Sequence, residues 1–485
     1  MNRLLVITAA AWALGAGAGA TAAPSPRPNI VVILADDLGY GDLGCYGHPR
    51  IKTPHLDRLA AEGTRFMQFY VPHSVCSPTR AAAVTGQYPS RWHTYAHFAW
   101  LSDNARRGMP DWLDVTAPSL PRALQQVDYR TALFGKWHLG GGSGRNFGGK
   151  AINSADAPPV TAYGFDEVRT VVGNGPTWLG LSPVEAPHDT YPYDDKAWGT
   201  ESSRCIADSS IDFIERHVRD RAGRPFWLNV WLHNPHVPLL PTDEMRKPYA
   251  DIGDRGTQAY YAVVTEMDRQ IGRLLARLDE LGLRENTLVL FTSDNGAPSR
   301  EGSLDSGRAI NLAVDTAGNN GPLRGWKWHL HEGGIRVPFI VRWPGHVPAG
   351  RTDTASILNL CDFAPTFTRL AGASMPAGHR PDGVDMSDAL FGRPFDRGQP
   401  MFWHNPTANR RGPQLAVREG PWKLLLEPDG TLVELYNLEQ DIAESANVAG
   451  KNPGIVNRLS SLLRAWHRSL PPPLDRPVWP EGQRR

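Results

Sequence analysis

The chain has 485 residues, and its 51 Lys and Arg nearly balance its 50 Asp and Glu, which leaves a formal net charge of +1. A balanced chain has no overall field that would attract nucleic acid or a membrane surface, so any recognition of anions must be local. The length predicts one large domain with a sizeable core and a smaller second domain.

The first 23 residues have the pattern of a secretory signal peptide. Arg3 supplies the charged start, residues 4–14 supply the apolar stretch, and residues 20–23 are small enough for cleavage. The apolar stretch is too short to cross a bilayer, which disfavours a membrane anchor. We therefore expect an exported protein, periplasmic or secreted, that has no contact with the membrane after the signal is removed.

Short apolar runs alternate with polar groups along the large domain. The four runs are residues 29–35, 131–134, 226–232 and 288–293, and each leads within two residues to Asp, Asn, Lys or His side chains. Continuous apolar runs of this length are typical of strands that are covered on both faces. Ligands bind beyond the carboxyl ends of strands in such sheets, so the pattern predicts an α/β fold with one chemically active edge.

Helical patterns separate these strands. The clearest covers residues 257–281, with apolar residues three and four apart and Gly282 as its stop. This stripe is too short for a coiled coil, and we expect the helix to lie on the sheet.

The pattern changes near residue 396. Short strands are expected over residues 415–418, 422–426 and 432–438, joined by turns that contain Gly420 and Gly430. This spacing predicts an antiparallel meander, and a final helix is expected over residues 453–468.

The most informative segment is Cys76-Ser77-Pro78-Thr79-Arg80. Pro78 suits a first helical position, and Gly86 suits the end of a helix. One helical turn brings Arg80 back beneath Cys76, which places a thiol and a guanidinium at the positive end of the helix dipole. The simpler interpretation is a free Cys before an ordinary capped helix.

Two sets of polar residues stand at the predicted strand ends. The first set offers only oxygen atoms, which favour Ca²⁺ or Mg²⁺ over Zn²⁺, and it comprises Asp36, Asp37, Asp294 and Asn295. Acid pairs and turns are common without a metal, but the shared position at strand ends favours a site for one divalent ion, with Ca²⁺ preferred. The second set would bind and process an anion, and it comprises Arg80, Lys136, His138, His236 and Lys327. In extended backbone Lys136 and His138 point the same way.

Several of these segments resemble the signatures of one known family. Residues 76–86 resemble the first signature of the type I sulfatases, in which a maturation enzyme oxidises the Cys of Cys-x-Pro-x-Arg to formylglycine. Residues 128–138 resemble the second signature, except that Asp128 stands where a Gly is usual. His236-Val237-Pro238 follows the family pattern, and residues 323–338 resemble the block that carries a further active-site lysine.

The resemblance implies an arylsulfatase-like member of the alkaline phosphatase superfamily. Such a protein has a large mixed sheet between helix layers and a smaller C-terminal antiparallel sheet with a helix. The predicted organisation is a signal peptide over residues 1–23, a catalytic domain over 24–395 and a C-terminal subdomain over 396–485.

The resemblance also implies roles for individual residues. Cys76, converted to formylglycine and hydrated, would supply the nucleophile and join Asp36, Asp37, Asp294 and Asn295 around the metal. Lys136 and Lys327 would hold the sulfate oxygens, and His236 would protonate the leaving alcohol. His138 would take a proton from the second hydroxyl of the hydrated aldehyde so that sulfate is expelled, and Arg80 would hold the site together.

Two alternatives to a sulfatase stay open at this point. Phosphonate and phosphate ester hydrolases of the same superfamily can share the formylglycine motif. A non-catalytic binder of sulfated glycans is disfavoured because binding alone does not need an acid, a base and a nucleophile.

The substrate is expected to be a sulfated carbohydrate. Trp326 and Trp328 flank Lys327 where many relatives carry Gly, and aromatic faces pack well against sugar rings. His329 and His331 are available for hydroxyl contacts, and residues 93–100 and 140–199 are expected to form loops at the rim. The alternative is that these Trp residues fill the domain core. Of the four Cys, conversion of Cys76 would leave three, enough for one disulfide at most.

Overall fold

The computed structural model describes residues 27–99, 101–140, 157–171, 195–220, 223–237, 239–298, 317–407 and 412–475. The predicted signal peptide lies outside these ranges, and so do Trp100 and most of the predicted rim segment over 140–199. In the described part of the chain, no helix combines the length and the apolar character that crossing a bilayer requires.

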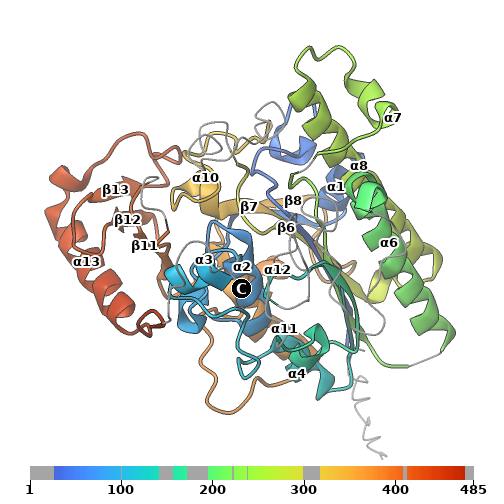
Figure 1. Ribbon diagram of the computed structural model, residues 1–485, viewed down its shortest axis with the longest axis horizontal. Helices are drawn as coiled ribbons and strands as arrows, with labels where there is room; N and C mark the ends of the chain where they lie inside the picture. Colours follow the sequence, from blue (N-terminus) through green and yellow to red (C-terminus); the bar gives the residue numbers. More distant parts are fainter. Residues whose placement is uncertain are drawn as a thin grey trace, which may run out of the picture.

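A nine-stranded mixed sheet forms the centre of the molecule (Figure 1). Its strands run in the order β4-β3-β5-β1-β6-β7-β2-β8, with β9 beside β2, and β7 is antiparallel to both of its neighbours. The strands are β1 Asn29–Ala35, β2 Thr64–Tyr70, β3 Arg130–Lys136, β4 Glu167–Val171, β5 Phe226–Trp231, β6 Thr287–Ser293, β7 Arg336–Arg342, β8 Arg351–Asp353 and β9 Leu358–Asn359. The four predicted strands are confirmed as β3, β5, β1 and β6, which lie side by side and pair in parallel, with β4 as a fifth parallel strand at the edge.

The register of these strands aligns their carboxyl ends. Leu34 of β1 is paired with Trp231 of β5, and Ala35 of β1 is paired with Ser293 of β6. The residues that follow the strands therefore emerge at one edge of the sheet, which places Asp36 next to Asp294. This is the edge at which parallel α/β sheets bind their ligands.

Helices cover both faces of the sheet (Figure 1). The helices α1 Pro54–Ala61, α6 Asp195–Arg219 and α8 Arg255–Glu280 pack on one face, near α7 Asp243–Arg246. The other face is covered by α2 Cys76–Thr85, α4 Leu120–Gln125, α11 Phe363–Ala371 and α12 Ser387–Leu390. Two further short helices are α3 Leu101–Arg106 and α10 Glu332–Ile335. The helix predicted over 257–281 is confirmed as α8, which begins two residues earlier because the Asp254 carboxylate accepts a hydrogen bond from Thr257 N at 2.8 Å.

The C-terminal part forms a second, four-stranded antiparallel sheet. Its strands are β10 Met401–His404, β11 Leu415–Glu419, β12 Trp422–Leu426 and β13 Glu434–Asn437, and α13 Pro453–Arg468 lies on it. Trp466 of α13 stacks on Phe402 of β10 with 4.9 Å between ring centroids. The predicted meander and final helix are confirmed, whereas β10 was not predicted; the domain boundary at residue 396 stays a prediction.

One part of the fold corrects the sequence analysis. The segment 140–199 was expected to be loop, but Glu167–Val171 within it forms β4, the edge strand beside β3, and α6 begins at Asp195. Val168 and Val171 are buried, so this short alternating stretch belongs to the core. Its five residues are too few to give a strand signal against the surrounding Gly and Pro residues.

Candidate active site

Cys76 is the first residue of α2 and lies at the active edge of the sheet. Val75 before it is extended, at φ −146° and ψ 150°, and the helix ends at Gly86 with φ +68°. The prediction that Pro78 occupies the first helical position is wrong, because Pro78 is the third residue. Proline is tolerated there because the first N–H groups of a helix have no partner within it.

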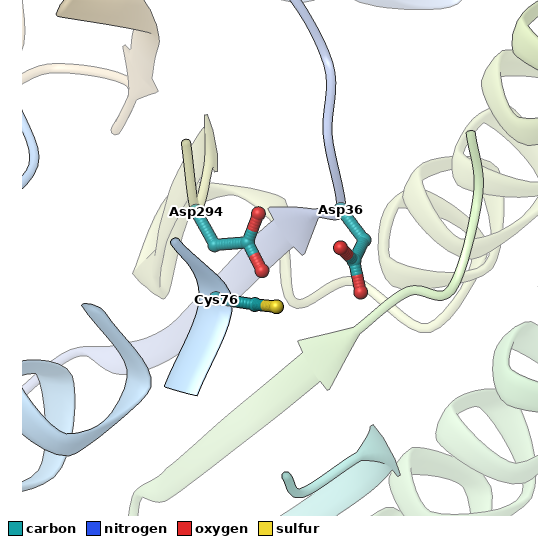
Figure 2. Close-up of side chains that lie close together, drawn as sticks. All are labelled: Asp36, Cys76 and Asp294. Carbon is teal, nitrogen blue, oxygen red and sulfur yellow. The ribbon is translucent and has the colours of Figure 1, made fainter. Parts of the chain in front are cut away.

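Three side chains converge at this edge (Figure 2). Cys76 comes from the start of α2, Asp36 follows β1 and Asp294 follows β6, and their potential ligand atoms all lie within 4.8 Å of one another. A second such group joins Asp36, Asp37 and His236. The predicted carboxylates and the thiol are therefore brought together, and an imidazole that was not in the predicted metal set lies beside them.

Arg80 ties these carboxylates together. Its guanidinium donates to Asp294 Oδ2 from Nε at 3.1 Å and from Nη2 at 2.7 Å, and Nη2 also reaches Asp36 Oδ2 at 3.2 Å. Its Nη1 donates to the carbonyl of Lys136 at 2.7 Å. All three charged side chains are fully buried, so the planar donor fork of Arg80 fixes the relative positions of two strand ends.

Two lysines also form ion pairs with carboxylates of the site. Lys136 Nζ lies 2.5 Å from Asp36 Oδ2, and Lys327 Nζ lies 2.7 Å from Asp37 Oδ2. Burial raises the pKa of Asp36, but Lys136, His236 and Arg80 outweigh it and bring that pKa below its usual value. Burial and the negative charge of Asp36 raise the pKa of Asp294.

The oxygen-bearing residues fit a hard divalent cation. Asp36 Oδ1 and Asn295 Oδ1 are buried and have no hydrogen-bond partner, although a buried polar oxygen is normally satisfied. The Asn295 amide is oriented by its Nδ2, which donates to Asp37 Oδ1 at 2.6 Å. Two unsatisfied oxygens next to two further carboxylates are a donor set that suits Ca²⁺ or Mg²⁺.

His236 presents one ring nitrogen to this cluster. Its Nδ1 lies 2.7 Å from the carbonyl of Val237, which can only accept, so Nδ1 carries the hydrogen. Its Nε2 lies 3.6 Å from Asp37 Oδ2. Burial, followed by the charges of Lys136 and Lys327, brings the pKa of His236 well below its usual value.

His138 has the complementary arrangement. Its Nε2 lies 3.2 Å from the carbonyl of Phe98 and carries the hydrogen, while Nδ1 is buried without a hydrogen-bond partner. Burial, Lys136 and His97 lower the pKa of His138 well below its usual value, so Nδ1 has a lone pair available for a proton. The assumption of extended backbone from Lys136 to His138 is wrong, because His138 adopts φ 53°.

The thiol of Cys76 is poorly suited to act as a nucleophile in its unmodified form. Burial raises its pKa, and the opposing charges of Lys136 and Lys327 do not cancel that effect. A thiol rather than a thiolate therefore occupies position 76, and the thiolate is the reactive form.

The segment that carries Lys327 packs tightly against the loop that carries Asn295. Gly296 N donates to the carbonyl of Gly334 at 3.1 Å, and a Cβ added at Gly296 would lie 1.8 Å from the carbonyl oxygen of Gly333. Only glycine permits this approach. It brings Asn295 and Lys327 to the same site although they are distant in the sequence.

Trp328 of this segment and His97 form a row of rings next to His138. Trp328 adopts φ 84° and its ring lies edge-on to His97, with 5.4 Å between centroids, while His97 lies 6.1 Å from His138. The prediction that His331 is available for substrate hydroxyls is wrong, because His331 is buried and its Nε2 lies 2.8 Å from Glu434 Oε2. His329 packs on Trp326, with 4.4 Å between ring centroids.

The unusual Asp128 and the cysteine count noted in the sequence also have structural outcomes. Asp128, which replaces a usual Gly, adopts φ 64°, a left-handed conformation that Asp tolerates better than most residues. All four cysteines are free in this structure, and three of them, Cys76, Cys205 and Cys361, are buried.

Two residues that contact the backbone of Trp328 were not predicted: Asn405, which follows β10, and Ser74, which lies just before α2. Asn405, after β10, donates to the carbonyl of Trp328 at 2.7 Å, and Ser74 accepts from Trp328 N at 3.0 Å. Ser74 lies two residues before Cys76, a proximity that could have drawn attention to it. Asn405 lies beyond a strand that was not predicted, and no sequence signal marks it.

Comparisons with known proteins agree with this geometry. The sulfatase family model matches residues 28–373, and the model for the C-terminal region of N-sulphoglucosamine sulphohydrolase matches residues 325–467. The chain is 33% identical to arylsulfatase A of Homo sapiens over 480 residues, which cover 90% of this chain and 86% of that protein. It is also 33% identical to N-acetylgalactosamine-6-sulfatase of Canis lupus familiaris, over 87% of this chain and 76% of that protein.

Solved structures show the same fold. The crystal structure of Ps i-CgsB in complex with k-i-k-neocarrahexaose superposes with a TM-score of 0.77 at 27% identity, covering 92% of this chain and 94% of that one. The phosphonate monoester hydrolase of Agrobacterium radiobacter shares the fold alone, with a TM-score of 0.62 at 20% identity over 91% of this chain and 96% of that one. An enzyme rather than a non-catalytic binder is thus established by relatives that cover most of the chain. The chain belongs to the sulfatase family, has the fold of the alkaline phosphatase superfamily and is a sulfuric ester hydrolase.

Proposed function

We propose that the protein is an exported sulfatase that removes sulfate from a sulfated carbohydrate, with Cys76 converted to formylglycine and one divalent ion, Ca²⁺ in preference to Mg²⁺, beside it. The observation that carries the proposal is the convergence of Cys76, Asp36 and Asp294 within 4.8 Å at the end of the sheet. A formylglycine-generating maturation enzyme would act on the Cys-x-Pro-x-Arg core before folding is complete, because the thiol is buried in the folded chain.

The metal would be held by Asp36, Asp37, Asp294 and Asn295. When bound, it would polarise an oxygen of the sulfate ester and favour the deprotonated form of a hydroxyl beside it. The three carboxylates of the set match the three cations Arg80, Lys136 and Lys327, so a divalent ion would give the site a net positive charge for an anionic ester.

Three cationic side chains would bind the substrate and hold the carboxylates in place. Lys136 and Lys327 would bind sulfate oxygens, since both ammonium groups are buried at the site. Arg80 would hold Asp36 and Asp294 in place without moving, because all of its strong partners belong to the site framework.

The two histidines would move protons at opposite ends of the reaction. His236 directs Nε2 into the site, and a bound anionic ester would oppose the lowering of its pKa, so this imidazole can protonate the leaving alcohol. His138 has an unpartnered Nδ1, which can take a proton from the second hydroxyl of the hydrated formylglycine so that the carbonyl re-forms and sulfate leaves.

Two observations support a carbohydrate substrate. Trp328 and His97 form an aromatic wall next to His138, and aromatic faces pack well on sugar rings. Among the similar proteins, one is named for N-acetylgalactosamine 6-sulfate and another was solved with a neocarrahexaose.

The test has two stages. Mass spectrometry of protein made together with a formylglycine-generating enzyme should show the aldehyde at residue 76, and Cys76→Ala should fold normally but lose essentially all activity. The converted enzyme is then assayed for sulfate release from N-acetylgalactosamine 6-sulfate, glucosamine 6-sulfate, carrageenan oligosaccharides and 4-nitrophenyl sulfate, with 4-nitrophenyl phenylphosphonate as the phosphoryl comparison. Wild-type turnover in Cys76→Ala would refute the mechanism, and preferred cleavage of the phosphonate would refute the substrate class.

A further inference from the structure

The turn that contains Lys327 and Trp328 is in a strained conformation. Trp328 adopts φ 84°, a region that bulky residues rarely occupy. Strain of this kind persists only where the surrounding structure holds it, and it is concentrated at functional sites. Two backbone hydrogen bonds hold the turn, from Lys327 N to the carbonyl of Ala297 and from Trp328 N to the carbonyl of Ser74, both at 3.0 Å.

A third restraint comes from the C-terminal sheet. Asn405 is fully buried, and its Nδ2 donates to the carbonyl of Trp328 at 2.7 Å and to Ser74 Oγ at 3.3 Å. Its Oδ1 accepts from the backbone N and the hydroxyl of Thr407, at 3.2 and 2.7 Å. Because donors hold the oxygen and acceptors face the nitrogen, the orientation of the amide is set by its surroundings.

The conformation of the turn decides where the indole of Trp328 stands. The indole lies edge-on to His97, and the His97 ring lies next to that of His138. His97 is itself fixed, because Arg107 Nη1 donates to its carbonyl at 3.0 Å and Phe98 N donates to Ser77 Oγ at 3.1 Å. A change in the backbone at Trp328 would therefore displace one side of this wall and leave the other in place.

We propose that Asn405 is a positioning residue for substrate specificity. It holds the Trp328 turn so that the indole forms the wall against which the sugar ring next to the sulfate lies. Asn405 acts through Trp328 and has no role in cleavage of the ester bond. This inference rests on the proposed function, since it needs a carbohydrate beyond the sulfate group.

An ordinary stabilising role for Asn405 predicts a different result. Loss of a merely structural hydrogen bond would lower stability and affect all substrates equally. Loss of a positioning contact changes the ratio of kcat/KM for a saccharide sulfate to kcat/KM for 4-nitrophenyl sulfate, whose small ring does not require the wall.

The experiment compares Asn405→Ala, Asn405→Asp, Trp328→Ala and the Asn405→Ala/Trp328→Ala double variant. Asn405→Asp keeps the Oδ1 contact with Thr407 and turns the Nδ2 donor into an acceptor that faces two oxygens. The control is Asn447→Ala, an exposed asparagine of the same subdomain, which removes hydrogen bonds from Leu435 N and Ala449 N and one to the carbonyl of Val433. The saccharide is the panel member that the wild type cleaves fastest.

We expect the specificity ratio to fall about tenfold in Asn405→Ala and in Asn405→Asp, mainly through KM, as in Trp328→Ala. The double variant should show little additional loss, because both changes remove the same wall. Asn447→Ala should leave the ratio unchanged. An unchanged ratio in both Asn405 variants, fully additive losses, or failure of both variants to fold would overturn the inference. A wild-type enzyme that cleaves no saccharide sulfate would instead refute the proposed function.

Discussion

Arg80→Lys is the most direct test of how the active edge of the sheet is held together. Arg80 makes three hydrogen bonds to the carboxylates of Asp36 and Asp294 and one to the carbonyl of Lys136. A lysine at this position keeps the positive charge but has a single nitrogen, so it cannot bridge Asp36 and Asp294 with the same geometry. We expect at least two of the four hydrogen bonds to be lost.

The magnitude follows from the buried setting. A hydrogen bond to a charged group contributes about 1.5–3 kcal/mol, so the loss of two bonds should lower the free energy of unfolding by roughly 3–6 kcal/mol. Misplacement of the carboxylates should also lower kcat by about 100-fold or more, since stabilisation of charge in the transition state depends on groups that are already in position.

Arg397→Lys is the matched control. Arg397 is also buried and donates two hydrogen bonds to Asp362, at 2.7 and 2.9 Å, but it does not contact the site. It should lose about 1.5–3 kcal/mol of stability, from one hydrogen bond to a charged group, and keep its kcat. Urea unfolding and steady-state kinetics at saturating Ca²⁺ measure both quantities. Wild-type kcat in Arg80→Lys, or an equal loss of kcat in Arg397→Lys, would refute the reasoning.

Three further predictions concern the metal, the substrate and pH. Chelation should abolish activity and Ca²⁺ should restore it, while Asp37→Asn should weaken metal binding measured by calorimetry; full activity in metal-free protein would contradict the site. Trp328→Ala should reduce kcat/KM for a sulfated oligosaccharide much more than kcat/KM for 4-nitrophenyl sulfate, and equal losses would leave a small-ester sulfatase. Burial opposes ionisation of Glu434, but hydrogen bonds from His331 and Tyr436 lower its pKa from 4.5 to about 2. Its contribution to stability is therefore complete above pH 4.5 and is lost as the pH falls towards 2, so urea unfolding of Glu434→Gln should show a weaker dependence on acid.

The catalytic edge could be predicted from the sequence because local signals and sheet geometry agree there. An apolar run that ends in Asp36-Asp37 or in Asp294-Asn295 identifies both a strand and the polar group at its end. Parallel pairing then brings separate strand ends together without any knowledge of loops. The candidate metal ligands Asp36, Asp37, Asp294 and Asn295 could be placed at this edge for this reason, and so could Lys136.

The parts that could not be predicted depend on contacts between distant segments. Asn405 and Trp328 are 77 residues apart, and their hydrogen bond exists only because the C-terminal sheet packs beside the segment that carries Lys327. His331 is a similar case. Its position four residues after Lys327 suggests a contact with substrate, but the imidazole is buried in the fold and its Nε2 lies 2.8 Å from Glu434 Oε2 of β13. Side-chain exposure is a property of the assembled fold, and neighbouring residues in the sequence do not determine it.

Backbone strain at the site has the same origin. Asp37, His138 and Trp328 all have positive φ angles, of 66°, 53° and 84°, although none is glycine. Each of these conformations is unfavourable by itself, and single-sequence patterns predict ordinary backbone at all three positions. The three residues belong to segments that follow β1, β3 and β6, so packing of the whole sheet edge is needed to hold them. A glycine at any of them would relieve the local strain but would also remove the carboxylate, the imidazole or the indole, which explains why functional side chains occupy these positions at a cost in stability.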